Sequence, residues 1–480
     1  MDWITVERGA ADSSNLFQHI IYTSKEMADK LKTKTKLIFG QKEIPITVKA
    51  NPAILSSTGI HFENPAIFQM SQGTIEELLL HTSATYQMYY SDSTIHIGPV
   101  IGFLLGDQHF YYHHRRMKEL TDAMGVYEQV GGLFVSFRYC SIDWNDKCIF
   151  GQFFNFISQK WEYGKLPIPS VVYRRGFNSR NNFVNQFKDE FNWTVFNEVR
   201  FDKWEFYNRI KDNEYLNPII PETVVLNLTN LITFLHRYKK VILKPKNLSR
   251  GRGISIISEK PNGWIEIHDH QLYNDFIIHQ TQLEEYLRKG IYQQNEYIIQ
   301  PYINLAKIDG RPWDIRVVMQ KNGSNQWLCN GIECRLAPIG RMITNISNGG
   351  RALYLNEALE LAFGTKVDID QIEKEILLIS LEFCKIMDET GYHFAEFGLD
   401  LALDQQQHFW FIEANVRPAF KGFKELDKRI YQRICYEPIL YSAQVAGFGR
   451  EGQDENKIQH HSGPECTKLS NHTSEYGKTE

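Results

Sequence analysis

A short polar stretch near the C-terminal end of the chain separates two apolar runs and predicts a β-hairpin. The runs cover residues 397–403 and 409–415, and the residues between them read DQQQH. Counting outward from the turn places Asp400 opposite Glu413, and the two-residue period of a strand places Asn415 on the face of Glu413. Opposed carboxylates destabilise a sheet, so this pattern favours a divalent cation between them, and three hard oxygen ligands suit Mg²⁺ held partly by phosphates. A solvated hairpin face without a metal is the alternative for this segment alone.

The overall composition is that of a soluble globular protein with several domains. The chain has 480 residues, of which 42% are hydrophobic and 23% charged, and this length predicts about three domains. The 53 basic and 57 acidic residues give a net charge of −4, which excludes the basic surface of a nucleic-acid binder or a polybasic membrane anchor. Any anionic ligand must therefore be held by a local cluster.

The cysteines and the N-terminal sequence favour a cytoplasmic protein. The seven cysteines are odd in number and include no CxxC pair, which argues against a disulfide framework or a zinc site. The N-terminus reads MDWITVERGAADSS and lacks the pattern of a signal peptide. No segment reaches ~18 uninterrupted apolar residues, so we expect no membrane span.

Changes of pattern along the chain predict four regions. Residues 1–92 show short alternating runs and indicate a small β-rich domain. Strand and helix patterns alternate over residues 93–190, as in an open α/β domain. Residues 191–448 carry the remaining strands and helices, and the polar tail 449–480 is expected to be disordered.

Two elements can be predicted closely. Residues 97–105 form an apolar run that we expect to be one strand at the start of the α/β domain, with Gly98, Pro99 and Gly102 at its turns. Isoleucines and a phenylalanine spaced by 3, 4, 3 and 4 residues predict a core-facing helix over residues 367–388.

A glycine-rich loop after a short apolar strand is a candidate phosphate site. Lys244 ends the strand, and residues 244–253 read KPKNLSRGRG. The glycines allow unusual backbone angles, and a serine hydroxyl with exposed amides can donate to oxyanions. The Walker A pattern is absent and a strand follows, so the loop would join antiparallel strands over a nucleotide; a plain turn is the alternative. The candidate residues are Lys244, Ser249, Arg250, Gly251 and Gly253.

Two further segments could complete a nucleotide site. Lys203, within FDKWEFY, lies at the start of a predicted helix and could reach a phosphate from the other side. An ordinary exposed helical lysine is the alternative reading of this residue. Gln300, Pro301, Tyr302 and Ile303 follow an apolar strand, as would a linker whose backbone reads the adenine edge, although any strand exit has a similar sequence.

Arginines follow in a strand and beyond the hairpin. Residues 313–320 alternate so that Asp314 and Arg316 share one face. A guanidinium at that position could neutralise a transferring phosphoryl group, and a surface pair between Asp314 and Arg316 is the alternative. Arg335 would return on the partner strand toward the same cleft, and Arg417 after the hairpin could hold a substrate carboxylate or the γ-phosphate.

The order of these motifs resembles the ATP-grasp superfamily. KPKNLSRGRGI, GRPWDIRVVMQ, ITNISNGG and FGLDLALDQQQHFWFIEANVRP are similar to the endospore coat-associated (YheC/YheD-type) branch and, more distantly, to tubulin tyrosine ligase-like proteins. The resemblance covers residues 95–423. It implies a mixed α+β and α/β protein, in which two α+β lobes close over ATP and two Mg²⁺ ions after a Rossmann-like pre-ATP-grasp domain and the small β-rich domain.

The resemblance also implies roles for single residues. It places Lys203 and Lys244 on the ATP phosphates under the loop 249–253, and the segment 300–303 beside adenine. Asp400, Glu413 and Asn415 would bind Mg²⁺, and Arg316 would contact phosphate. The stretch YRRGFNSR at residues 173–180 departs from the family pattern, which leaves substrate recognition by the middle domain open.

These observations predict an ATP- and Mg²⁺-dependent carboxylate–amine ligase that acts through an acyl phosphate. Arg316 and Arg417 would be its catalytic cations, because phosphoryl transfer depends on positioning and charge neutralisation. The expected partners are ATP and a small carboxylate and amine, or a peptide, without nucleic acid or membrane. An ATP-grasp kinase and a non-catalytic spore-coat protein with an ATP-shaped cleft are the alternatives.

Overall fold

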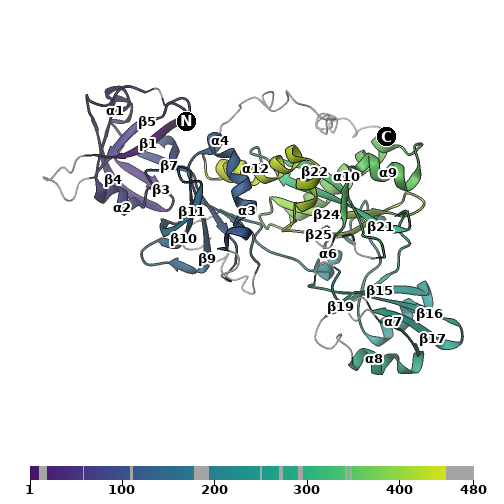
Figure 1. Cartoon of the computed structure of the whole chain (residues 1–480). Helices are drawn as coiled ribbons and strands as arrows, with labels where there is room; N and C mark the ends of the chain where they lie inside the picture. The colour runs from purple at the N-terminus through teal and green to yellow at the C-terminus, as the bar shows by residue number, and fades with distance from the viewer. Residues whose placement is uncertain are drawn as a thin grey trace, which may run out of the picture.

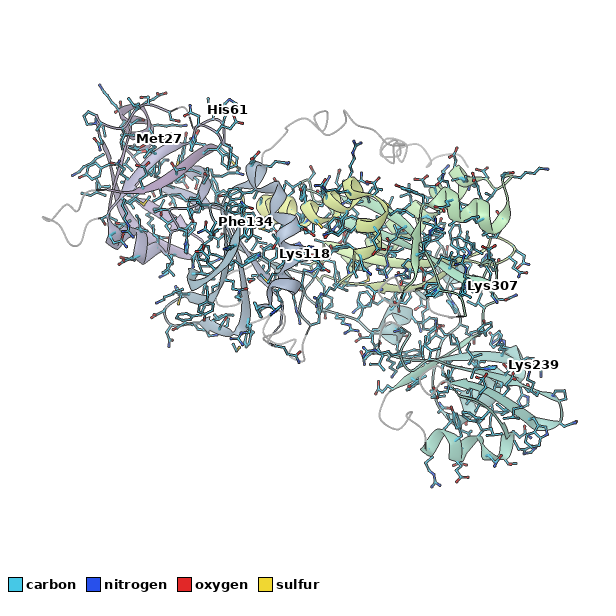
Figure 2. All side chains as sticks on the ribbon, in the orientation of Figure 1. Met27, His61, Lys118, Phe134, Lys239 and Lys307 are labelled. Carbon is cyan, nitrogen blue, oxygen red and sulfur yellow. The ribbon has the colours of Figure 1, made fainter. Side chains whose placement is uncertain are left out.

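The computed structural model describes residues 1–9, 19–57, 59–106, 108, 112–177, 194–248, 251–269, 274–289, 296–340, 344 and 349–449. Within these residues the chain forms an N-terminal barrel, a middle α/β sheet and two lobes, each built on its own sheet (Figure 1). The barrel and the first lobe lie at opposite ends of the molecule in Figure 1. In Figure 2, Lys239 marks the first lobe and Lys307 the second.

The N-terminal part is a closed barrel with the strand order β1-β5-β2-β4-β3-β7-β6. Alternate residues of its strands, such as Ile4 and Val6, are buried in the interior, as the two-residue period requires. The predicted limit at residue 92 falls between β6 and β7, which both belong to the barrel. Its elements are β1 (Asp2–Arg8), β2 (His19–Thr23), α1 (Lys25–Leu31), β3 (Lys36–Phe39), β4 (Lys42–Ala50), β5 (Ala66–Met70), α2 (Gln72–Leu78), β6 (Thr85–Ser91) and β7 (Thr94–Gly98).

The middle part is an open sheet with the order β11-β10-β9-β8-β12-β13, in which β9, β8, β12 and β13 run parallel. Val135 and Val172 on one face share a hydrophobic cluster with the barrel, whereas Phe134 (labelled in Figure 2) and Tyr173 on the other face pack toward helices. The elements are β8 (Val100–Leu104), α3 (His114–Ala123), α4 (Tyr127–Val130), β9 (Leu133–Asp143), β10 (Cys148–Asn155), β11 (Lys160–Pro167), β12 (Val171–Arg174) and β13 (Thr194–Phe196).

The single strand predicted over residues 97–105 is wrong. The chain divides at Pro99: β7 pairs inside the barrel and β8 pairs inside the middle sheet. Proline has no backbone N–H to donate to a ladder, so an apolar run that contains one can serve two sheets in succession.

The first lobe is a sheet with the order β14-β19-β15-β16-β17-β18, covered on one face by α7 and α8. The loop 246–254 joins the antiparallel strands β15 and β16, as the sequence predicts. The elements, with the preceding helix α6, are α6 (Lys203–Ile210), β14 (Val224–Val225), α7 (Leu228–Tyr238), β15 (Lys240–Pro245), β16 (Ser255–Glu259), β17 (Trp264–Asp269), β18 (Asn274–His279), α8 (Leu283–Lys289) and β19 (Tyr297–Pro301).

The second lobe is a sheet with the order β23-β22-β21-β24-β25, and β20 pairs with β21. Ile315 and Val317 on one face pack against α10, which confirms the helix predicted over residues 367–388, and α11 and α12 cover part of the other face. The elements are β20 (Lys307–Ile308), β21 (Arg311–Lys321), β22 (Trp327–Leu336), β23 (Arg351–Leu353), α9 (Leu355–Phe363), α10 (Ile369–Glu389), β24 (Glu396–Leu403), β25 (Phe409–Asn415), α11 (Lys421–Leu426) and α12 (Lys428–Val445).

A buried polar network joins the middle sheet to the second lobe. Tyr173 donates to Glu396 Oε2 at 2.5 Å, and the Arg175 guanidinium lies 3.6 Å from the same carboxylate. Gln320 donates to Glu396 Oε1 at 2.8 Å. Because these side chains are buried and paired, the network fixes how the two parts meet.

Candidate active site

Four charged residues form one row across adjacent strands of the second lobe. On β22, β21, β24 and β25 the register pairs Glu333 with Arg316, Arg316 with Asp400, and Asp400 with Glu413. Residues directly opposite each other in a sheet project from the same face, so the four side chains share the face of α11 and α12. The row forms part of a cleft of about 1000 Å³ between the two lobes and the middle domain.

The predicted pairing of Asp400 with Glu413 is confirmed. Near the turn Leu403 pairs with Phe409, and a β-bulge between Leu401 and Asp400 then shifts the register by one residue. Asn415 Nδ2 donates to Glu413 Oε1 at 3.1 Å, so these two side chains share one face as predicted. The hairpin therefore presents its three oxygen-bearing side chains to the cleft.

Asp400 is neutralised by arginines rather than left opposed to a bare carboxylate. Arg316 Nε donates to Asp400 Oδ1 at 2.5 Å and Nη2 donates to Oδ2 at 3.1 Å. Arg335 Nη2 lies 2.9 Å from Asp400 Oδ2. Burial alone would raise the pKa of Asp400, but the two guanidinium groups, Arg316 most strongly, hold this pKa at about 2. Two arginines therefore neutralise Asp400 without a metal ion, whereas the sequence pattern pointed to a divalent cation for this role.

Arg335 also binds Asp314, the residue that the sequence suggested as a partner of Arg316. Its Nε and Nη2 donate to the Asp314 carboxylate at 2.6 and 2.8 Å, and Thr344 donates to the same group. The alternative of an Asp314–Arg316 surface pair is thus wrong, because each aspartate binds an arginine from a neighbouring strand. Both arginines line the cleft.

Two lysines reach the hairpin from other elements. An Asp202 capping box begins α6 and orients Lys203, whose Nζ donates to Leu248 O at 2.6 Å and lies 3.6 Å from Glu413 Oε2. Lys244 lies on the cleft-facing side of β15. Burial lowers the pKa of Lys244 to about 8, the nearby Lys203 ammonium acts in the same direction, and Glu413 opposes both. Lysines and acid therefore face each other across one cleft.

The glycine loop lies over the same cleft in part. Gly251 lines it, and Gly251 and Gly253 have φ angles of 70° and 72°, the left-handed region that suits glycine. A Cβ on Gly253 would lie 2.9 Å from the Tyr297 hydroxyl, so the loop packs closely on β19. Ser249 and Arg250 lie outside the described residues.

The segment predicted to border adenine, residues 300–303, lies beside the cleft but is not among the described residues that line it. Gln300 pairs with Ile242 on β15, is buried, and donates to Thr223 at 2.9 Å. Pro301 ends β19, and the amide of Tyr302 donates to Lys240 O at 3.0 Å. The Ile303 carbonyl accepts from Leu305 at 3.0 Å. An adenine ring here would meet the apolar side chain of Ile242, which does line the cleft.

The far end of the cleft is cationic and includes residues that the sequence did not single out. Arg417 lines it directly after the hairpin, with Lys421 at the start of α11. The middle domain contributes Glu119 and Arg175 to the cleft. Arg175 belongs to the stretch at residues 173–180 whose sequence departs from the family pattern. Glu333 is the other omission, although the alternation of β22 places it on the face of Arg335.

Asp400, Glu413 and Asn415 are a donor set that fits Mg²⁺. All three offer hard oxygens from one face of a hairpin, and the neighbouring cleft has room for phosphates. Glu413 is 25% exposed, and among the described residues its side chain accepts one hydrogen bond, from Asn415 to Oε1, so it can turn toward a metal. Asp400 would have to share its oxygens between the metal and the two guanidinium groups.

Two α+β lobes that face each other across a cleft lined by lysines, arginines and a carboxylate hairpin define an ATP-grasp architecture. The chain belongs to the YheC/D-like ATP-grasp family, whose model matches residues 192–445. This match confirms the resemblance and the fold class predicted from the sequence.

Known proteins similar to the chain include two relatives from Bacillus subtilis (strain 168). The chain is 26% identical over 372 residues to endospore coat-associated protein YheD, covering 75% of this chain and 80% of that protein. It is 26% identical over 299 residues to endospore coat-associated protein YheC, covering 59% of this chain and 79% of that protein. Among solved structures, N5-carboxyaminoimidazole synthetase from Staphylococcus aureus complexed with ADP has a TM-score of 0.42 and 12% identity, covering 74% of this chain and 79% of that chain. Of the helices that the structure describes, none combines the length and apolarity needed to cross a bilayer.

Proposed function

We propose that this protein is an ATP- and Mg²⁺-dependent ligase that joins a carboxylate to an amine on amino-acid or peptide substrates. The observation that carries the proposal is the approach of Lys203 Nζ to within 3.6 Å of Glu413 Oε2, beside Lys244 and Asp400 in one cleft. The cleft thus combines cations that suit phosphates with oxygens that suit Mg²⁺, as the binding of a nucleoside triphosphate requires.

The chain's own residues would act by position and charge. Lys203 and Lys244 would hold the phosphates from the side opposite the hairpin, and the loop containing Gly251 would cover them. Asp400, Glu413 and Asn415 would hold Mg²⁺, which when bound neutralises phosphate charge. Arg316 and Arg417 would stabilise the transferring phosphoryl group as the substrate carboxylate attacks it. The amine then displaces phosphate from the acyl phosphate.

The cleft's far end supports a substrate that carries a carboxylate. Arg175, Arg417 and Lys421 line it, and guanidinium groups bind carboxylates through paired hydrogen bonds. We further propose that the chain acts in the cytoplasm and shares the spore association that its relatives' names state, which rests on those names alone.

The experiment begins with thermal denaturation in ATP and Mg²⁺ and continues with ADP release in the presence of amino acids and peptides. Binding should raise the melting temperature with ligand concentration, since a ligand that binds only the folded state stabilises it by mass action. Release of ADP should require both a carboxylate and an amine. ADP release that needs no amine and leaves a phosphorylated product would instead support a kinase. Binding without release across the panel would support a non-catalytic protein.

A further inference from the structure

Glu333 is a buried carboxyl group in the wall of the cleft. It lies in the middle of β22, is 2% exposed, and contributes to the cleft wall. Its Oε2 has no hydrogen-bond partner among the described residues. Arg316 is directly opposite in the register, but its guanidinium donates to Asp400 on the other side.

The surrounding chain leaves space for this carboxyl group. Gly422, in the first turn of α11, packs against it so closely that a Cβ there would lie 2.1 Å from Glu333 Oε2. Any larger residue at position 422 would displace the carboxyl group from the cleft wall. An unpartnered buried carboxyl group costs free energy, and a donor group that enters the cleft and binds this carboxyl group would offset the cost.

The charged groups around Glu333 shift its pKa in opposite directions. Burial raises its pKa to about 7; Arg316 and Arg335 oppose this, and Asp314 and Asp400 add to it. From α11, Lys421 lines the same cleft. Near neutral pH the group therefore exchanges a proton readily, as a general base should.

The other acids of the cleft are engaged. A carboxylate can only accept hydrogen bonds, so the entering partner must donate. Asp314 and Asp400 each bind arginine. The acids that line the cleft among the described residues are Glu119, Asp202, Asp314, Glu333, Asp400 and Glu413.

Each of the three remaining acids also has a neighbouring partner. Asp202 accepts from the first amides of α6, and Glu413 faces Lys203 at 3.6 Å. The Glu119 side chain is 61% exposed, and its Oε2 lies 3.8 Å from Arg175 Nη2. Glu333 is thus the acid of the cleft that is buried and still lacks a donor.

We propose that Glu333 receives the amine of the acceptor substrate, a step that rests on the ligase function proposed above. The ammonium group donates a proton to the Glu333 carboxylate, which becomes a carboxylic acid. The freed nitrogen lone pair forms the C–N bond with the acyl carbon, and the C–O bond to phosphate breaks with its electron pair on phosphate. The second nitrogen proton leaves to the phosphate or to water.

The test measures amine binding, so it does not depend on turnover. The full chain, saturated with Mg²⁺ and a non-hydrolysable ATP analogue, is titrated calorimetrically with methylammonium, glycinamide and alaninamide, and with glycolamide as the hydroxyl counterpart of glycinamide. These titrations are repeated at pH 6, 7 and 8 with wild type, Glu333→Gln and Glu119→Gln. The last variant makes the same change on the exposed acid of the same cleft.

We expect wild type to bind an amine more tightly than glycolamide, and more tightly at pH 8 than at pH 6. Glu333→Gln should weaken amine binding by about tenfold, which corresponds to about 1.4 kcal/mol, and abolish the pH dependence, while Glu119→Gln changes neither. No amine binding by wild type, or equal binding by Glu333→Gln, would overturn the proposal. If Glu333→Gln does not fold, Glu333→Asp is measured instead, because it keeps the carboxylate but moves it back by one methylene group. An unchanged amine affinity in Glu333→Asp would also overturn the proposal.

Failure of the ligase function gives a different result. In that case wild type would bind the nucleotide analogue and an amine but release no ADP with any carboxylate. Failure of the Glu333 assignment would leave acceptor-dependent ADP release intact in Glu333→Gln, with the same KM for the amine and the same pH profile.

Discussion

Arg316 clamps Asp400 through two hydrogen bonds between β21 and β24, at 2.5 and 3.1 Å, in the middle of the second lobe's sheet. Both side chains are buried. Breaking a buried ion pair by removing one partner leaves an uncompensated charge, which usually costs about 3–5 kcal/mol. Asp400, which the sequence predicted to face Glu413, is therefore a structural partner of Arg316 as well as a candidate metal ligand.

Asp400→Asn should destabilise the protein, because it leaves the Arg316 guanidinium without its paired carboxylate and removes one of the two carboxylates that Arg335 binds. We expect a loss of about 3 kcal/mol in the free energy of unfolding, measured by urea denaturation. Opposed carboxylates destabilise a sheet, so the pairing of Asp400 with Glu413 considered alone would suggest the reverse. Glu357→Gln, at an exposed ion pair with Arg351, should change stability by less than about 1 kcal/mol. An Asp400→Asn variant as stable as wild type would show that the clamp is unimportant.

Glu413→Gln separates catalysis from stability. Glu413 is partly exposed and lies 3.6 Å from Lys203, so its removal should change the free energy of unfolding by less than about 1 kcal/mol. The same change removes a hard oxygen from the proposed metal site, so we expect Mg²⁺-dependent ADP release to fall at least about 100-fold. Circular dichroism melts and ADP assays over a Mg²⁺ series give the two readouts. An active Glu413→Gln enzyme would contradict the metal-site assignment.

Glu396 tests whether the middle sheet and the second lobe unfold together. It is fully buried, accepts from Tyr173 across the junction, and accepts from Gln320 within the second lobe. Glu396→Ala removes the buried carboxylate that Tyr173 and Arg175 share and leaves Arg175 with the more distant Glu119, at 3.8 Å, so we expect a loss of about 3–5 kcal/mol and a separate, earlier transition for the middle domain. Differential scanning calorimetry resolves the transitions. A single transition at the wild-type temperature would mean that apolar packing alone holds the junction.

Local patterns were sufficient to predict the hairpin, and its register shows why. A turn count from the sequence pairs Asp400 with Glu413, although Leu403 actually pairs with Phe409 and a bulge restores the predicted pair at the site. The alternation of β21 also predicted the face of Arg316. Such features depend on neighbours in sequence and on the two-residue period.

The partners across strands could not be predicted in the same way. Arg316 meets Asp400 because β24 lies beside β21, and Arg335 meets Asp314 because β22 lies on its other side. Strand order is a property of the whole fold, so one sequence does not reveal which charge neutralises which. For this reason Glu333 was not predicted as a site residue, although it lies two residues before Arg335 in the sequence.

Gly253→Ala tests the glycine loop against a matched glycine. Gly253 has a φ of 72° and a Cβ there would lie 2.9 Å from the Tyr297 hydroxyl, whereas Gly310 has a φ of 74° with nothing within 4 Å. Both changes impose about 1 kcal/mol of left-handed backbone strain, and only the first also displaces the loop. We expect weaker ATP binding in Gly253→Ala alone, measured by calorimetry. Equal ATP affinity in the two variants would mean that the loop does not cover the nucleotide.

Lys244 should couple nucleotide binding to a proton. Burial lowers its pKa from 10.5 to about 8, so above that pH the folded protein loses a proton that the unfolded chain keeps until about 10.5. Stability should therefore rise with pH between about 8 and 10.5, since the unfolded state binds more protons there.

Phosphates bound near Lys244 favour its charged form, so ATP binding near pH 8.5 should take up part of a proton. Its affinity should fall as pH rises above 8, by up to about tenfold per unit. Calorimetric titrations in buffers of different ionisation enthalpy give the number of protons. Lys244→Met should abolish the uptake, whereas Lys239→Met, at an exposed lysine of the same lobe (Figure 2), should preserve it. Uptake that persists in Lys244→Met would assign the proton to another group and remove Lys244 from the phosphate site.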